Sequence, residues 1–325
     1  MTFEDFLNEW RNSEGFIKVQ SSGSTGAPKE MKLSKEFVAQ SAQRTIDFFN
    51  LTSLSNLHSC VSPDFIGGKM MAVRAEISGA DFSWEKPSNQ PLKDISDKKI
   101  IDLLAVVPSQ MVFILENSEN IPKIKNIIIG GSPIHPNLRR RIEESGLNAY
   151  ETYGMTETAS HIALRKVVYD NIPFKTLPGI IVSTDDDKCL KIKFENGVEI
   201  LTNDIAELIS STQFFIKGRR DDIIISGGKK INPIEIEEKI SHLIKDPFYL
   251  TGIPDEKWGE KLMMIIENSS PFSDIEITRL IEDFKLVLEN WQLPKEIKFV
   301  DKIPLTGNGK IKRKGLGNPT HTNKE

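Results

Sequence analysis

A loop rich in hydroxyl side chains follows a short apolar stretch near the start of the sequence. It reads Ser21-Ser22-Gly23-Ser24-Thr25-Gly26-Ala27-Pro28-Lys29. Backbone N–H groups and hydroxyl groups of such a loop can converge on phosphate oxygens, and Lys29 adds a positive charge. The loop is not a Walker A motif, because Pro28 stands where that motif requires glycine. On composition alone, a solvated Ser/Gly loop is the more common reading.

Four further segments contain residues that could bind or activate a ligand, and each of them also has an ordinary structural explanation. They are Tyr153-Gly154-Met155-Thr156-Glu157, Thr202-Asn203-Asp204, Gly218-Arg219-Arg220-Asp221 and Pro304-Leu305-Thr306-Gly307-Asn308-Gly309-Lys310. Taken singly, these segments are a surface turn, a strand-end cap, a solvated charge cluster and a mobile basic tail. No Gly-x-Ser-x-Gly or Cys–His arrangement supplies a side-chain nucleophile, so attack by substrate oxygen and then by an external thiol fits better.

The elements that must position these segments alternate between strands and helices. Residues 16–20, 102–107 and 125–129 read as short strands, and Ser34 is placed to begin a helix that continues to Phe49. A helix over about 136–145 begins with a proline and ends at a glycine, which is the expected asymmetry. This alternation predicts an α/β core with a parallel sheet.

The pattern changes after about residue 180. Asn196-Gly197 between two alternating stretches predicts a hairpin, and therefore a small antiparallel portion of a mixed sheet. A charged break at 218–222 predicts two domains: a large α/β lobe over 1–220 and a small, mobile α+β domain over 221–325. In the second we expect a strand at 223–225, a helix opened by Asn232-Pro233 and a helix over about 274–291.

Composition excludes several classes of protein. The chain has 325 residues, 38% hydrophobic and 27% charged, which is globular, and its net charge of −4 argues against a nucleic-acid partner. Its two cysteines and five histidines show no disulfide framework, Cys-based zinc spacing or HExxH motif. No apolar run is long enough to span a membrane, and the first residues lack the regions of a signal peptide. We expect a cytoplasmic enzyme, with a homodimer as one open oligomeric state.

The five segments, in this order, resemble those of the adenylate-forming enzymes, which include acyl-CoA synthetases, peptide-synthetase adenylation domains and luciferases. The resemblance covers about residues 16–314 and implies ATP, Mg²⁺ and coenzyme A. It implies that the loop 21–29 binds phosphates, that Tyr153 stacks on adenine and that Thr156 contacts the α-phosphate. It further implies that Glu157 binds Mg²⁺, that Asp204 and Arg219 contact the ribose, and that Lys310 is catalytic. Asn203 departs from the family, where glycine is usual.

The resemblance also assigns the acyl and thiol sides of the site. Gly130, Gly131 and Ser132 would form the floor between the acyl group and adenine, with Gly154 and Met155 also on the nucleotide side. The small domain would turn about Asp221, withdrawing Lys310 and presenting Gly227 and Gly228 to the pantetheine arm, since glycines permit close approach. Phe65, or a neighbour, stands where many members have a histidine that gates the acyl pocket.

Within the family, the chain most resembles the o-succinylbenzoate–CoA ligases of menaquinone biosynthesis, through Val106–Gln110, Gly68–Arg74 and Gly79-Ala80. The second carboxylate of that acid needs a cation when buried, and Arg74 and Lys69 are the candidates, against the alternative of solvated helix charges. Several alternatives remain open. The substrate could be another aryl or short acyl acid, and the acceptor a carrier-protein thiol. The chain could also be a non-catalytic nucleotide-binding relative, or a fragment that lacks its other part.

Members of the family usually have a long segment before the phosphate loop, and here only residues 1–20 precede it. The resemblance therefore implies an amino-terminally shortened form with apolar surface left to cover. Phe3, Phe6, Leu7 and Trp10 follow helical spacing, so we expect an opening helix that docks one apolar face there, or else a partner chain.

Overall fold

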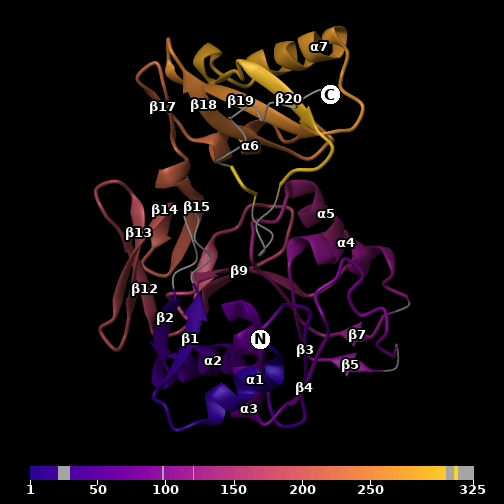
Figure 1. Ribbon diagram of the computed structural model, residues 1–325, viewed down its shortest axis with the longest axis vertical. Coiled ribbons are helices and arrows are strands. Elements are labelled where there is room, and N and C mark those ends of the chain that lie inside the picture. Colours follow the sequence, from indigo (N-terminus) through magenta and orange to yellow (C-terminus); the bar gives the residue numbers. More distant parts are fainter. Residues whose placement is uncertain (21–29, 97–98, 120, 305–310, 314–325) are drawn as a thin grey trace, which may run out of the picture. The chain divides into compact units, whose positions relative to one another are not determined.

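The computed structural model describes residues 1–20, 30–96, 99–119, 121–304 and 311–313 (Figure 1). The chain forms two compact units. The first unit comprises residues 1–183, 191–200 and 208–215, and the second comprises 184–190, 201–207 and 216–325. The predicted division at residue 220 and the hinge at Asp221 stay predictions.

A mixed sheet, eleven-stranded in the described part of the chain, organises the fold. Its parallel part runs, in sheet order, β9 (Ala149–Met155), β8 (Ile127–Ile129), β6 (Leu103–Val106), β3 (Asn56–Ser59) and β4 (Asp81–Trp84). All residues of β8 and β6 are buried, as expected for strands covered on both faces. The predicted α/β class and mixed sheet are confirmed.

The same sheet continues beyond β9. The further strands are, in sheet order, β10 (Ser160–Lys166), β11 (Phe174–Thr176), β15 (Gln213–Arg219), β14 (Glu199–Ser210), β13 (Cys189–Phe194) and β12 (Ile180–Thr184). The pairs β9–β10, β10–β11 and β11–β15 are antiparallel. Gly197 has a φ of 86° in the turn between β13 and β14, and the Phe194 N–H donates to the Val198 carbonyl at 2.9 Å. The predicted Asn196-Gly197 hairpin is therefore confirmed.

Three helices and a short hairpin make up the amino-terminal part of the first unit, drawn in indigo to purple in Figure 1. They are α1 (Phe3–Arg11), β1 (Phe16–Gln20), β2 (Glu30–Ser34), α2 (Lys35–Phe49) and α3 (Ile66–Ser78). Thr2 and Asp5 form a reciprocal capping box at the start of α1, and Ser34 caps α2 as predicted. Phe3 and Phe6 are buried with Met70 and Val73 of α3, so the opening helix docks on the core as expected.

Two further helices follow the strands β6 and β8. Helix α4 (Pro108–Glu116) and helix α5 (Pro136–Glu144) pack with the parallel strands in one apolar core. Helix α5 ends before Gly146, whose φ is 72°, which confirms the predicted start at a proline and stop at a glycine. A small parallel pair, β5 (Ile100–Ile101) and β7 (Lys123–Ile124), lies beside them.

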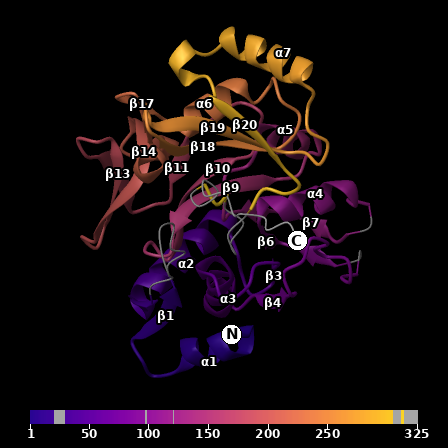
Figure 2. The ribbon, with the colours of Figure 1, turned by 45° about the horizontal axis from the view of Figure 1, so that its top comes forward.

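The second unit has its own sheet and core. The sheet order is β17 (Lys229–Ile231), β16 (Ile224–Ser226), β19 (Gly259–Glu267) and β18 (Phe248–Asp255), with β20 (Glu296–Val300) parallel to β19. Helix α6 (Pro233–Ile240) is capped by Asn232, and α7 (Asp274–Lys285) lies over the sheet, as Figures 1 and 2 show. Helix α7 is shorter than predicted, because Leu288 and Leu293 reach the same core from the chain beyond it.

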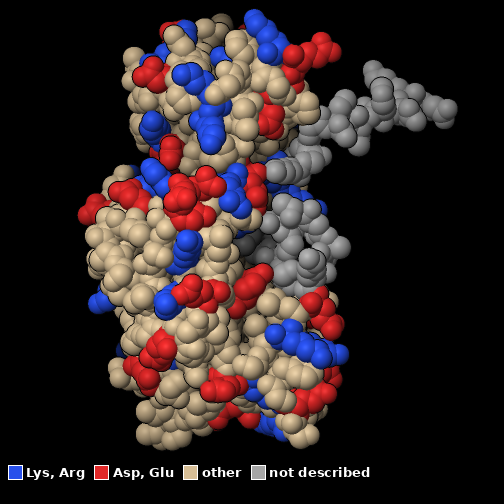
Figure 3. All heavy atoms as spheres, turned by 90° about the vertical axis from the view of Figure 1, so that its left-hand side faces the viewer, with Lys and Arg blue, Asp and Glu red and all other residues tan. Residues whose placement is uncertain are grey.

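The surface carries charges of both signs, as the nearly balanced numbers of acidic and basic residues predict. On the face drawn in Figure 3, Lys and Arg side chains lie among Asp and Glu side chains. Among the residues that the structure describes, no helix is both long enough and apolar enough to span a membrane.

Candidate active site

The predicted phosphate loop, residues 21–29, and the predicted catalytic Lys310 lie outside the described residues. The two strands that flank the loop are described: Gln20 of β1 pairs with Glu30 of β2. The Thr156 hydroxyl donates to the Gln20 carbonyl at 3.4 Å. The structure therefore places Thr156, from a segment 136 residues further on, beside the strand end that leads into the loop.

The segment from Tyr153 to Glu157 closes β9 and turns into β10. The Tyr153 ring packs on Phe214, with ring centroids 5.2 Å apart and nearly perpendicular planes, and on Phe174 at 5.8 Å. A side chain at Gly154 would meet the Ser160 carbonyl at 2.2 Å, so only glycine fits between β9 and β10 here. The turn is fixed by Thr158, whose hydroxyl accepts from the Met155 N–H at 2.9 Å.

Glu157 is half-buried in this turn. Within the described residues, its carboxylate has no hydrogen-bond or ion-pair partner. An uncommitted carboxylate beside a predicted phosphate site is a suitable oxygen ligand for a divalent cation such as Mg²⁺.

Gly130, Gly131 and Ser132 follow the carboxyl end of β8. The Gly130 N–H donates to the Val106 carbonyl at 3.1 Å, and Gly131 has a φ of 94°, which favours glycine. Because β8 and β9 are parallel neighbours, these residues emerge at the same sheet edge as Tyr153. Ligands of open α/β sheets bind outside the carboxyl ends of the strands, so this edge is the expected place for a substrate.

A buried charge network supports this edge, and sequence reasoning did not find it. The Glu151 carboxylate of β9 accepts from Arg139 Nη2 at 2.5 Å and from Arg165 Nε at 2.8 Å. It also accepts from the Ile134 N–H at 3.3 Å, which ties the chain after Ser132 to β9. Arg139 and Arg165 lie 12 and 14 residues from Glu151 in the sequence, and these spacings match no sequence motif.

Arg74 lies in the interior of the first unit, with none of its side chain exposed. Within the described residues, none of its three guanidinium nitrogens has a hydrogen-bond partner. Burial lowers the pKa of Arg74, because the guanidinium loses its hydration and no counter-charge in the described part of the chain replaces it. The positive charge of Arg74 also contributes, after burial, to a lowered pKa of His161, whose Nε2 lies 2.9 Å from the Thr45 hydroxyl.

Lys69, the other cation considered for the acyl group, is turned toward the opening helix. Its ammonium lies 3.1 Å from the Lys18 carbonyl, 3.8 Å from the Glu9 carboxylate and 4.6 Å from the centre of the Phe6 ring. Burial still lowers the pKa of Lys69, but the Glu9 and Asp64 carboxylates offset part of that effect, in contrast to Arg74. Its role toward the substrate stays a prediction.

In the second unit, the predicted ribose and hinge residues form one hydrogen-bonded group. Arg219 Nη1 donates to Asp204 Oδ1 at 2.6 Å, and Nη2 donates to Asp221 Oδ2 at 3.3 Å. Asn203, the departure from the family pattern, donates to the same Asp221 oxygen at 3.0 Å and accepts from Arg220 at 2.8 Å. Asn203 thus links the predicted hinge to the strand that carries Asp204.

The two glycines predicted for the thiol side lie in the turn between β16 and β17. Gly227 has a φ of 56° and Gly228 a φ of 77°, and a side chain at Gly227 would meet the Trp258 ring at 2.7 Å. The Gly227 N–H donates to the Trp258 carbonyl at 2.8 Å. The turn therefore requires glycine for its own packing, whatever binds there.

A family model described as AMP-binding enzyme matches residues 20–188, a little over half of the chain. The chain belongs to this family. The match includes the loop 21–29, the glycines after β8 and the segment from Tyr153 to Glu157. The predicted family and the predicted enzyme class, an AMP-forming acid ligase, are confirmed.

Relatives of this AMP-binding enzyme cover nearly its whole length. An acyl-CoA synthetase (AMP-forming)/AMP-acid ligase II-like protein from Dyadobacter fermentans is 31% identical, with a TM-score of 0.61, over 95% of this chain and 91% of that one. A 2-succinylbenzoate–CoA ligase from Listeria monocytogenes is 28% identical over 95% of this chain and 71% of the relative. An o-succinylbenzoate coenzyme A synthetase from Bacillus subtilis, 21% identical, matches 93% of this chain and 69% of that one with a TM-score of 0.80, and so shares the fold.

Proposed function

We propose that the protein is an ATP-dependent carboxylate–CoA ligase that converts 2-succinylbenzoate to its CoA thioester. In the first step a carboxylate oxygen of the acid attacks the α-phosphorus of ATP, which gives an acyl adenylate and pyrophosphate. In the second step the thiol of coenzyme A displaces AMP. The family, the relatives named 2-succinylbenzoate–CoA ligase and the five sequence segments support this proposal.

The first step brings two anions together, so the binding residues must neutralise charge. We assign Ser21–Gly26 and Lys29 to the phosphates of ATP and Thr156 to the α-phosphate. Tyr153 is assigned to adenine, and its ring is positioned by contacts with Phe214 and Phe174. Asp204 and Arg219 are assigned to the ribose, with Arg219 Nη1 donating to Asp204 Oδ1.

The half-buried Glu157 carboxylate, which has no partner within the described residues, fits the Mg²⁺ that accompanies ATP. When bound, Mg²⁺ would withdraw negative charge from the phosphate oxygens. Lys310 is assigned to the acid's carboxylate and the α-phosphate in the first step only. The carboxy-terminal domain would then turn about Asp221 and present Gly227 and Gly228 to the pantetheine arm.

Arg74 is the observation that supports a dicarboxylic acid as the substrate. A buried guanidinium without a counter-charge is costly, and a ligand carboxylate would remove that cost. 2-Succinylbenzoate has one carboxylate to activate and a second to pair with Arg74. A monocarboxylic acid would leave the charge of Arg74 uncompensated.

Pyrophosphate release over a panel of acids, with and without coenzyme A, tests the proposal. We expect 2-succinylbenzoate to give the highest kcat/KM. Benzoate, which lacks the succinyl chain, and 4-oxo-4-phenylbutyrate, which lacks only the ring carboxylate, should react poorly. The thioester should form with coenzyme A and not with a carrier-protein thiol. Pyrophosphate release that is as efficient with a monocarboxylic acid as with 2-succinylbenzoate would overturn the assigned substrate. If no acid supported ATP–pyrophosphate exchange, the assignment of ligase activity would be overturned.

A further inference from the structure

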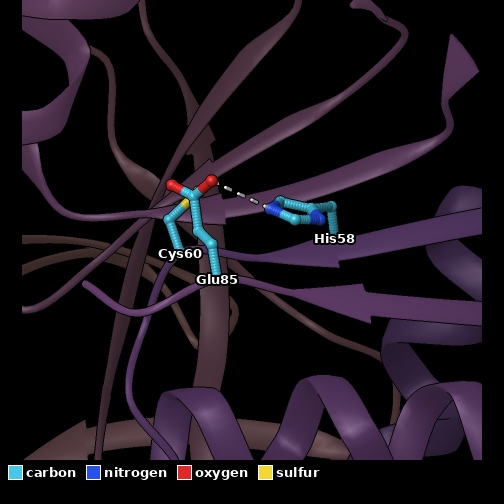
Figure 4. A group of neighbouring side chains, drawn as sticks. All are labelled: His58, Cys60 and Glu85. Carbon is cyan, nitrogen blue, oxygen red and sulfur yellow. Dashed lines mark ion pairs between the residues drawn. The ribbon is translucent and has the colours of Figure 1, made fainter. Parts of the chain in front are cut away.

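Two buried residues, His58 and Cys60, and the half-buried Glu85 form a cluster at the carboxyl ends of two parallel strands (Figure 4). His58 is in β3, and Cys60 follows two residues later, so both side chains point to the same face. Ser83 of β4 pairs with His58 in register, which brings Glu85, two residues further, beside Cys60. The Glu85 N–H donates to the Ser59 carbonyl at 3.2 Å and holds the two segments together.

The geometry of the three side chains suits a transition-metal ion. One ligand atom from each of them lies within 4.8 Å of the other two, and His58 Nε2 is 3.7 Å from Glu85 Oε2. In a tetrahedral zinc site, bonds of about 2.0–2.3 Å place ligand atoms roughly 3.3–3.7 Å apart. The observed separations exceed those of a zinc site by about 1 Å at most, so an ion would have to draw the three ligand atoms together by that amount.

The hydrogen bonds around the cluster leave one ligand atom unsatisfied. His58 Nδ1 lies 2.9 Å from the Ser83 hydroxyl, while His58 Nε2 is buried and has no hydrogen-bond partner within the described residues. With the proton on Nε2, His58 would point its N–H at the Glu85 carboxylate. With the proton on Nδ1, directed at Ser83, the Nε2 lone pair and the Glu85 carboxylate are two acceptors that a cation can bridge.

The surroundings resemble those that orient metal ligands in proteins. Histidine ligands usually donate their second ring N–H to a partner, as Ser83 permits here, and ligating carboxylates are themselves hydrogen-bonded. Both Glu85 oxygens accept from the Leu92 N–H at 3.1 Å, although Leu92 must adopt a φ of 65° to provide it. Cys60 belongs to the apolar core, whereas Glu85 is 21% exposed, so the cluster has a dry side and a side open to solvent.

We propose that His58, Cys60 and Glu85 bind a zinc ion, with water in the fourth position, that cross-links the carboxyl ends of β3 and β4. The combination of imidazole, thiolate and carboxylate favours Zn²⁺ over Mg²⁺ or Ca²⁺, which prefer oxygen ligands. The ion would fix the turn between Cys60 and Phe65 that leads into helix α3. This site is separate from the proposed Mg²⁺ ligand Glu157 and does not rest on the proposed function. Nothing in the sequence indicated a zinc site, because the three ligands come from two separate strand ends and form no spacing motif.

The test uses the full chain, stripped of metal with a chelator and then titrated with Zn²⁺. We expect one equivalent of tightly bound zinc by elemental analysis. Substitution with Co²⁺ should give a thiolate-to-cobalt charge-transfer band, which imidazole and carboxylate ligands alone do not produce. Because this spectrum is measured on the unmodified chain, it remains decisive even if a variant fails to fold.

Variants then assign the ligands. Cys60→Ser should abolish the band and stoichiometric zinc binding, whereas Cys189→Ser, at the other cysteine, should change neither. Ser83→Ala should weaken zinc binding by about 10- to 100-fold, since it orients His58. Absence of stoichiometric zinc and of the cobalt band would overturn the site in favour of a direct contact between His58 and Glu85 without an ion. A band lost with Cys189→Ser and kept with Cys60→Ser would overturn it as well.

Discussion

Arg313 and Glu237 are joined by two parallel hydrogen bonds in the second unit, with Nη2 donating to Oε2 at 2.8 Å. Arg313 Nη1 also donates to the Leu250 carbonyl at 2.9 Å, and the Arg313 carbonyl accepts from the Thr251 hydroxyl at 2.7 Å. One residue earlier, the Lys312 N–H donates to the Pro304 carbonyl at 2.9 Å. These bonds hold Pro304, Lys312 and Arg313, which border residues 305–310 and therefore the predicted catalytic lysine in the sequence.

Arg313→Lys keeps the charge but cannot form the paired hydrogen bonds, so we expect it to misplace Lys310. The rate of adenylation should fall about 10- to 100-fold, because small displacements of a reacting group cost that much. Thioester formation from supplied acyl adenylate should change little. Pyrophosphate release and CoA consumption measure the two half-reactions, and Arg279→Lys on the exposed side of α7 is the control. A lower unfolding temperature with unchanged adenylation would make the Arg313–Glu237 pair a purely structural one.

Lys310→Ala should remove the charge that joins the acid to the α-phosphate. We expect the adenylation rate to fall on the order of 100- to 1000-fold, as for other groups that stabilise developing charge. Supplied acyl adenylate should still react with coenzyme A, and Lys302→Ala, an exposed lysine nearby, should leave both half-reactions unchanged. Equal losses in the two half-reactions would contradict the assignment of Lys310 to the first step alone.

Local signals in the sequence predicted much of the fold. The strand Phe16–Gln20, the Ser34 cap, the proline-to-glycine helix α5 and the Asn196-Gly197 hairpin were all confirmed, because each depends on a few adjacent residues. The predicted end of α7 was wrong, since apolar spacing continues past Lys285, where Leu288 and Leu293 reach the core from the chain on either side of a short 3-10 helix, Asn290–Gln292.

The site was harder to predict where its residues are far apart in sequence and are brought together only by strand pairing in the sheet. Glu151, Arg139 and Arg165 form a buried network across separate elements, and His58 and Glu85 come from different strands. Nor does the sequence distinguish Arg74 from Lys69: Arg74 is buried with no hydrogen-bond partner among the residues that the structure describes, whereas Lys69 has Glu9 beside it.

His161 should make the protein less stable in mild acid. Burial, and then the charge of Arg74, lower the pKa of His161 well below its usual value of 6.5. Below pH 6.5 the unfolded chain therefore binds a proton that the folded chain does not, so the free energy of unfolding falls as pH falls. The slope for one such group is at most about 1.4 kcal/mol per pH unit.

Urea unfolding of the wild type and of His161→Gln between pH 7 and pH 5 measures this effect. The variant should show a shallower slope below pH 6.5, and part of the slope should remain because burial also lowers the pKa of His135. His242→Gln, at an exposed position, should leave the slope unchanged. Parallel slopes for His161→Gln and the wild type would show that His161 does not stay neutral in the folded protein.

Arg74→Met should separate the stability of the free protein from its affinity for the acid. Removing a buried charge that has no partner in the described residues should raise the free energy of unfolding, by about 1 kcal/mol or more. The same change should raise KM for 2-succinylbenzoate much more than KM for ATP, because the second carboxylate loses its cation. Urea unfolding and initial-rate kinetics measure the two quantities, with Met71→Leu as a volume-conserving control in the same helix. A variant that loses stability, or whose KM values for acid and ATP rise in parallel, would show that Arg74 serves the fold and not the acid.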